Sequence, residues 1–140
     1  MNLIETALKI ALDAHIGQTD KAGEIYILHP LRLMNKMDHD YERAAALLHD
    51  VIEDSYYTSE KLKEYGIPDE VIEAVLCLTK NQGETYEEFI ERVRQNKLAK
   101  AVKKADLEDN INILRLKKLE QKDFDRLKKY HSAWNKLTST

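Results

Sequence analysis

The strongest chemical signal in the sequence is a group of ionisable residues that follows directly on an apolar helical segment. The stretch AAALLHDVIED carries His49, Asp50, Glu53 and Asp54 within about one and a half helical turns. His49 and Glu53 are four positions apart, so a continuous helix would place them on one face. Burying such groups costs free energy unless they are paired, hydrogen-bonded or bound to a metal ion. We therefore expect His49 and Asp50 to be metal ligands.

A second His-Asp dipeptide provides a comparison within the same chain. His39 and Asp40 lie in the polar stretch KMDHDYER, where Asp40 is expected to cap a helix and His39 to lie in a loop. The dipeptide alone is weak evidence, because it also arises by chance. Its context separates the two, and we do not expect His39 to bind a metal ion.

A cation held by two residues needs further ligands, and two other segments offer them. His29 precedes Pro30, which suits the first position of a helix and biases the residue before it away from the helical conformation. Asp106 lies four positions before Asn110 and shares a helix face with it. Asp109 lies about 60° from that face and is expected to be solvated. Two imidazoles and two carboxylates suit Mn, Fe, Zn or Mg, and leave coordination positions for water and a substrate oxygen.

The elements that must position these residues are helices. Apolar residues recur at helical spacing along almost the whole chain, and two-residue alternation is nowhere sustained. We predict an all-α fold, a single domain over residues 1–140 with about seven to eight helices and the metal site between them. The expected helix starts are Asn2, Pro30, Asp40, Thr58 or Ser59, Pro68, Thr85, about Leu98, and Asp123. The third helix would run without a break to Asp54, and the seventh to about Leu116.

Composition excludes several classes of protein. The chain has 140 residues, a formal net charge of −3 and one cysteine, Cys77, so no internal disulfide can form. No apolar run approaches the roughly 20 residues that cross a bilayer, and the N-terminus lacks the pattern of a signal peptide. A cytoplasmic location is the expectation. Residues 97–140 hold 12 Lys and Arg against 6 Asp and Glu, a basic region that could attract nucleic acid or polyphosphate.

The ordered motifs of the chain resemble the HD-domain superfamily of metal-dependent phosphohydrolases. Within it, the chain is similar to the hydrolase domain of RelA/SpoT-type alarmone enzymes and to the small stand-alone alarmone hydrolases. The segments that carry the resemblance are AHIGQ, YILHP, AALLHDVIED, LTK and VKKADLEDN, between about residues 5 and 116. The resemblance implies an HD-domain helical bundle that removes the 3′-pyrophosphate from guanosine tetra- or pentaphosphate. No synthetase domain is expected after residue 140, so such a protein would only degrade the alarmone.

The resemblance also implies roles for single residues. One divalent ion, usually Mn²⁺ in this family, would be held by His29, His49, Asp50 and Asp106. The acidic pair that positions and activates the attacking water would be Glu53 and Asp54. Asn110 would contact the nucleotide sugar and Lys21 would face the substrate. Lys103, three positions before a ligand, could offset substrate charge from the same helix face.

Departures from the family keep alternatives open. Thr19 and Asp20 stand where an Arg that packs on guanine usually precedes Lys21, Ile25 replaces a Pro, and Asn112 replaces an Arg. Another nucleotide is one alternative: an adenine alarmone, a nucleoside monophosphate or a dinucleotide phosphate. A non-catalytic nucleotide-sensing module is another, and nucleic-acid binding through the basic region is a third. We expect a small-molecule nucleotide substrate, no nucleic-acid or membrane partner, and a homodimer as one use of the amphipathic last helix.

Several other residues have ordinary structural interpretations. His15 and Cys77 are expected in the core, and Tyr56 and Tyr57 in turn packing. Tyr130 and Trp134 are expected to pack on the core, and Arg32 to lie at the surface unless the fold brings it to the cleft. Tyr26 could either pack near His29 or line the site.

Overall fold

The computed structural model describes residues 1–139, and over these residues the chain is helical apart from one isolated β-bridge between Thr19 and Ile25. The helices within this range are α1 (Leu3–His15), α2 (Leu28–Asn35), α3 (Asp40–Leu48), α4 (Val51–Asp54), α5 (Ser59–Glu64), α6 (Asp69–Cys77), α7 (Tyr86–Arg94), α8 (Lys97–Asn110), the 3₁₀ helix η1 (Ile113–Arg115) and α9 (Gln121–Thr138). The predicted all-α bundle is confirmed. Among these residues no helix is both long enough and apolar enough to cross a bilayer.

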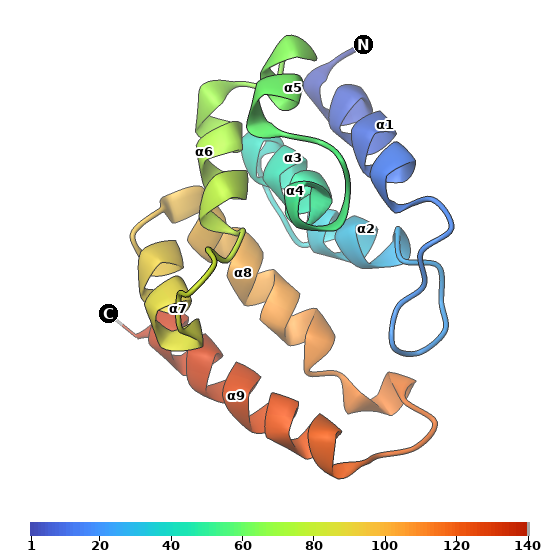
Figure 1. Ribbon diagram of the computed structural model, residues 1–140, viewed down its shortest axis with the longest axis vertical. Coiled ribbons are helices and arrows are strands. Elements are labelled where there is room, and N and C mark those ends of the chain that lie inside the picture. Colours follow the sequence, from blue (N-terminus) through green and yellow to red (C-terminus); the bar gives the residue numbers. More distant parts are fainter. Residues whose placement is uncertain (140) are drawn as a thin grey trace.

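The helix α3 lies at the centre of the bundle and is contacted by α1, α2, α6 and α8 (Figure 1). The side chains from Ala44 to Leu48 are fully buried. The three small alanines let neighbouring helices approach closely, and the two leucines fill the space between them. α9 packs on α7 and α8, with Ala133 and Leu137 buried at the contact. His49 and Asp50 therefore follow the most densely enclosed segment of the chain.

Most helix starts are those that the sequence predicts. Asn2 and Glu5 form a capping box before α1, Thr85 and Glu88 form one before α7, and Thr58 caps α5. Two aspartates predicted as caps instead lie within their helices: α3 is preceded by His39 and α9 by Glu120. The main-chain N–H of His39 donates to the Glu42 carboxylate, and that of Glu120 donates to the Asp123 carboxylate. These acidic groups therefore satisfy the helix starts from inside the first turn.

The second helix begins earlier than predicted. α2 starts at Leu28, so Pro30 is its third residue and His29 lies in its first turn rather than in an extended conformation. The His29 N–H already donates to the Tyr26 carbonyl at 2.9 Å. Proline is tolerated there because the N–H groups of the first turn have no partner within the helix. The His29 ring is thus fixed to a helix and not to a loop.

The predicted third helix is broken at the two residues of chemical interest. α3 ends at Leu48, α4 begins at Val51, and Asp50 has φ −107° and ψ 2°. The ring Nδ1 of His49 donates to the Ala46 carbonyl at 2.8 Å, so a side chain takes an acceptor that a helical N–H would use. The predicted seventh helix also ends early: α8 stops at Asn110, and η1 follows.

Arg92 of α7 closes the C-terminal end of α6. Its guanidinium donates to the carbonyls of Cys77 at 3.1 Å and Thr79 at 2.9 Å, and its Nε donates to Glu84 at 2.8 Å. Carbonyls at the end of a helix have no partner within it, so Arg92 supplies one from outside. The hydrogen bond from Arg92 lowers the pKa of Glu84 to about 2.

We predict that Glu84→Gln lowers the free energy of unfolding at pH 7, and that the difference from wild type disappears as the pH falls towards 2. The pKa of Glu84 is depressed, so its ion pair contributes fully above about pH 4.5, the ordinary pKa, and is lost below it. Urea unfolding between pH 7 and pH 3 measures this. Glu87→Gln, on the exposed face of α7, is the control and should match wild type at each pH. A Glu84→Gln difference that stays constant across the range would contradict the account.

Candidate functional site

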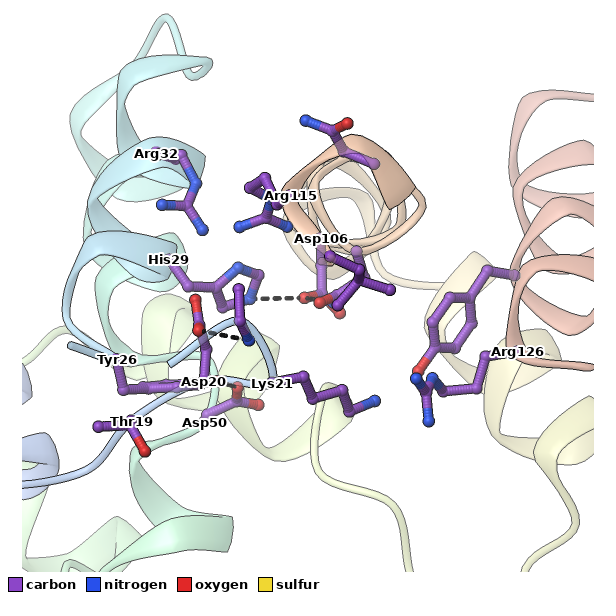
Figure 2. A pocket seen from close by; sticks show the side chains of 15 residues that line it. Thr19, Asp20, Lys21, Tyr26, His29, Arg32, Asp50, Asp106, Arg115 and Arg126 are labelled. Atoms are coloured by element: carbon purple, nitrogen blue, oxygen red, sulfur yellow. Dashed lines mark hydrogen bonds and ion pairs between the residues drawn. The ribbon is translucent and has the colours of Figure 1, made fainter. Parts of the chain in front are cut away.

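The four residues predicted to hold a metal ion converge. His29 comes from α2, His49 and Asp50 from the α3–α4 junction, and Asp106 from α8. Figure 2 shows His29, Asp50 and Asp106 close together. The Nε2 atom of His29 lies 2.8 Å from Oδ1 of Asp106, and that of His49 lies 3.6 Å from the same oxygen and 3.1 Å from Oδ2 of Asp50. Potential ligand atoms of His29, His49 and Asp50 all lie within 4.8 Å of one another. Residues 77 positions apart in the chain therefore form one cluster.

The chemistry of this cluster fits a cation. His49 donates through Nδ1 to the Ala46 carbonyl, and its buried Nε2 faces two carboxylates without a hydrogen-bond partner within residues 1–139. A lone pair directed at carboxylate oxygens is unfavourable unless a proton or a cation lies between them. Burial alone would lower the pKa of His49, but the negative charges of Asp50 and Asp106 outweigh it and raise the pKa well above its usual value. The mixed nitrogen and oxygen donors suit a divalent ion of intermediate softness.

Lys103 orients the Asp106 carboxylate through an ion pair with one of its oxygens. Its Nζ lies 2.9 Å from Oδ2 of Asp106, so the other oxygen of that carboxylate faces the imidazoles. The Lys103 side chain is 14% exposed and is not among those that line the adjacent cavity. The structure places this residue against a predicted ligand, whereas the sequence predicts it beside the substrate.

The solvated environment expected for Asp109 is wrong. The residue is 6% exposed. Its carboxylate accepts from Nδ1 of His29 at 2.6 Å and from Nε of Arg32 at 2.7 Å. α2 packs against α8, so a residue about 60° from the ligand face still meets the neighbouring helix. An acidic residue at that position gives no hydrophobic signal from which its burial could be predicted.

The acidic pair on α4 lies beside the cluster. Glu53 and Asp54 are exposed and are not among the residues that line the adjacent cavity. The pKa values of both are raised, because partial burial disfavours their charged forms and Asp50 adds negative charge nearby. The Gln18 amide lies 3.5 Å from Oδ2 of Asp54. A carboxyl group with a raised pKa is better placed to exchange protons near neutral pH.

A cavity of about 430 Å³ opens on the cluster. Its walls include the cationic side chains of Lys21, Arg32, Arg115 and Arg126 (Figure 2). Burial and the positive charge of Arg126 lower the pKa of Lys21, as expected of a cation in a cationic surrounding. Such a cavity favours an anionic ligand with several negative charges.

Of the three residues predicted to contact substrate, Lys21 and Asn110 line this cavity. Arg115 and Arg126 also line it, which the sequence did not predict, and so does Tyr130, which packs against the core as predicted. They come from η1 and α9, which follow α8 in the chain, and α9 packs along α8 (Figure 1). The only sequence signal for the two arginines was the basic composition of residues 97–140.

Contacts around the site show the positions of Tyr26 and His15. Tyr26 lines the cavity and donates to Asp50, and its ring also packs near that of His29 with centroids 5.6 Å apart, so both predicted positions are confirmed. His15 is 2% exposed, as predicted, and its ring packs against that of Tyr26 at a tilt of 52°, with centroids 4.6 Å apart.

The other residues with structural interpretations lie farther from the cluster. Both Tyr56 and Tyr57 donate to Asp13 of α1, and neither lines the cavity. His39 is exposed at the start of α3, and Cys77 is half-buried at the edge of the core.

Two curated proteins similar to this chain are named as a pyrophosphohydrolase and a synthase/hydrolase of guanosine polyphosphates. No protein-family model matches the chain. It is 43% identical over 97 residues to a guanosine-3′,5′-bis(diphosphate) 3′-pyrophosphohydrolase of Haemophilus influenzae, covering 64% of this chain and 14% of that protein. It is 36% identical over 126 residues to the bifunctional (p)ppGpp synthase/hydrolase SpoT of Escherichia coli, covering 79% and 18%. The chain thus spans less than a fifth of the length of these curated relatives.

A solved structure extends the similarity to the fold. The structure of a metazoan ortholog of SpoT that hydrolyses ppGpp matches with a TM-score of 0.81 and 24% sequence identity, covering 100% of this chain and 88% of that chain. The helical bundle described above is therefore the HD-domain fold. Over the segment that it shares with its curated relatives, the chain is similar to RelA/SpoT-type proteins.

Proposed function

We propose that the chain is a metal-dependent phosphohydrolase that removes the 3′-pyrophosphate from guanosine 3′,5′-bis(diphosphate), leaving GDP. The observation that carries the proposal is a cation-favouring cluster in the wall of a cavity that also presents four cationic side chains. A cation centre and a cationic cavity together suit a substrate with several phosphate groups. The printed names of the relatives, pyrophosphohydrolase and synthase/hydrolase, support this choice of substrate.

The ligands of the ion would be His29, His49, Asp50 and Asp106. When bound, a divalent ion such as Mn²⁺ supplies charge neutralisation at phosphoryl oxygens and a lowered pKa for water. Four protein ligands leave coordination positions for water and substrate on an octahedral ion. Tyr26 and Lys103 hold the two carboxylates in place by donating to Asp50 and Asp106.

The reaction needs one proton to leave the water and one to reach the leaving group. Glu53 or Asp54 would accept the proton of the attacking water, and their raised pKa values suit this exchange. The water oxygen forms a bond to the phosphorus that carries the 3′-oxygen. The bond between phosphorus and the 3′-oxygen breaks, and its electron pair goes to that oxygen, which takes up a proton. Pyrophosphate and GDP are the products.

The cavity walls would bind the rest of the nucleotide. Lys21 and Arg126 offer charge to phosphate oxygens, and Asn110 offers hydrogen bonds to the sugar. Guanidinium groups bind phosphate through paired N–H donors, so an arginine gives direction as well as charge. A different base is the second candidate, because Thr19 and Asp20 line the cavity where relatives are expected to have a base-packing arginine.

A panel of nucleotides tests the proposed substrate. With Mn²⁺, we predict release of pyrophosphate from guanosine 3′,5′-bis(diphosphate), and slower release from its adenine counterpart. Product analysis by ion-exchange chromatography measures both. Hydrolysis of nucleoside monophosphates alone would contradict the proposed substrate, and a preference for the adenine compound would favour the second candidate.

Mn²⁺ affinity tests the different roles assigned to the two His-Asp dipeptides, His49-Asp50 and His39-Asp40. We predict that the purified chain binds about one Mn²⁺ ion, and that His49→Ala and Asp106→Asn bind at least about 10-fold more weakly because each removes a ligand. His39→Ala is the matched control, since that histidine is exposed, and should bind like wild type. Titration followed by electron paramagnetic resonance gives the affinities. Equal affinity in all three variants would exclude this site.

Substitution of the acidic pair tests catalysis apart from binding. We predict that Glu53→Gln and Asp54→Asn both lower kcat, because general acid–base exchange is lost. The larger of the two losses is expected to be about 10²- to 10⁴-fold. Mn²⁺ affinity should stay near the wild-type value, and Glu60→Gln, an exposed acid on α5, should leave both unchanged. Full turnover in both variants would instead support a site that uses neither carboxyl group.

A further inference from the structure

Asp109 joins the metal cluster to the cavity wall. Its carboxylate is 8% exposed and accepts from Nδ1 of His29 at 2.6 Å. Arg32 donates to it twice, from Nε at 2.7 Å and from Nη2 at 3.0 Å. The Nη2 atom of Arg115 lies 3.5 Å from the same carboxylate and also donates to the Asp109 carbonyl. One imidazole and two guanidinium groups thus contact the same buried carboxylate.

The contact with His29 decides which nitrogen of that ring can bind a cation. A carboxylate can only accept, so the hydrogen between Asp109 and His29 is on Nδ1. When the ring is neutral, as it must be to bind a metal ion, the lone pair is then on Nε2, which lies on the other side of the ring, 2.8 Å from Oδ1 of Asp106. A carboxylate behind a ligating imidazole fixes both its tautomer and its orientation. His49 has the same arrangement with the Ala46 carbonyl as acceptor, so both rings direct Nε2 into the cluster.

The contacts with Arg32 and Arg115 fix the positions of two guanidinium groups in the cavity wall. Arg32 comes from α2 and Arg115 from η1, and both line the cavity. One carboxylate cannot neutralise two guanidinium groups, so positive charge remains for a ligand. The Nε of Arg115 is buried and has no partner among the described residues, which leaves a donor unused. Asp109 therefore holds the two arginines in position without cancelling their charge.

We propose that Asp109 is a positioning residue that keeps Nε2 of His29 directed at the bound metal ion and keeps Arg32 and Arg115 at the wall that receives substrate phosphate. The part of this inference that concerns Arg32, Arg115 and substrate phosphate is its substrate half, and it rests on the proposed function. The part that concerns His29 and the metal ion is its metal half, and it depends only on the cluster. The two halves predict different measurements, so they can be tested separately.

The metal half is tested with Asp109→Asn. An amide can turn its NH₂ group towards His29 and so favour the other tautomer, with the hydrogen on Nε2. We predict that Mn²⁺ affinity falls by about 10- to 100-fold, as is typical when such a partner is changed. Asp109→Glu, which keeps a carboxylate, should recover part of the loss. Glu108→Gln, the exposed neighbour on α8, is the matched control and should bind like wild type. Thermal unfolding checks that each variant is folded.

The tautomer itself can be read without any substitution. In wild-type protein loaded with diamagnetic Zn²⁺, long-range ¹H–¹⁵N spectra should show the His29 hydrogen on Nδ1. A hydrogen on Nε2, or wild-type Mn²⁺ affinity in Asp109→Asn, would overturn the metal half. This readout does not depend on whether a variant folds.

The substrate half is tested with Arg32→Gln. We predict at least a 10-fold rise in KM for guanosine 3′,5′-bis(diphosphate) with Mn²⁺ affinity unchanged. An unchanged KM would overturn this half. If wild type binds Mn²⁺ but cleaves no guanosine substrate, the proposed function fails, while the Mn²⁺ titration and the ¹⁵N spectra still decide the role of Asp109 at the metal.

Discussion

A single buried carboxylate, that of Asp106, is the contact on which the site depends. Nζ of Lys103 lies 2.9 Å from one of its oxygens, while Nε2 of His29 and Nδ2 of Asn110 lie 2.8 and 2.9 Å from the other. Burial would raise the pKa of Asp106, but the lysine and the two imidazoles outweigh it and hold the pKa well below its usual value. An unpaired charge in this interior would be costly, so α2, α3 and α8 must pack with these groups in contact. The same apolar surroundings that make the charge costly also strengthen its attraction for a cation.

The break between α3 and α4 gives the site its second carboxylate. His49 uses its ring to bond the Ala46 carbonyl, and the chain leaves the helical path at Asp50 before α4 begins. Asp50 thereby lies against Nε2 of His49 and accepts from Tyr26. The buried side chains from Ala44 to Leu48 anchor this junction on the preceding side. The helix is thus interrupted where its most enclosed segment meets the polar cluster.

The sequence predicted the parts of the molecule that local chemistry determines. Helical periodicity and capping residues such as Asn2 and Thr85 located most helices, and context distinguished His49 from His39. It did not predict what depends on how helices face one another. An isolated Asp109 looks like a surface residue until α2 packs over it. Arg126 reaches the cavity only because α9 returns along α8, and no spacing within α9 records that contact. The helix break was missed because a side chain competes with the main chain there, and periodicity cannot detect this.

The central claim is that two imidazoles and two aspartates from three parts of the chain hold one cation. A crystal of the protein grown with Mn²⁺ and measured at the manganese absorption edge tests it most directly. We predict one strong anomalous peak within coordination distance of His29, His49, Asp50 and Asp106, with Nε2 of both histidines facing it. A peak elsewhere, or no peak between these four residues at saturating Mn²⁺, would contradict the account.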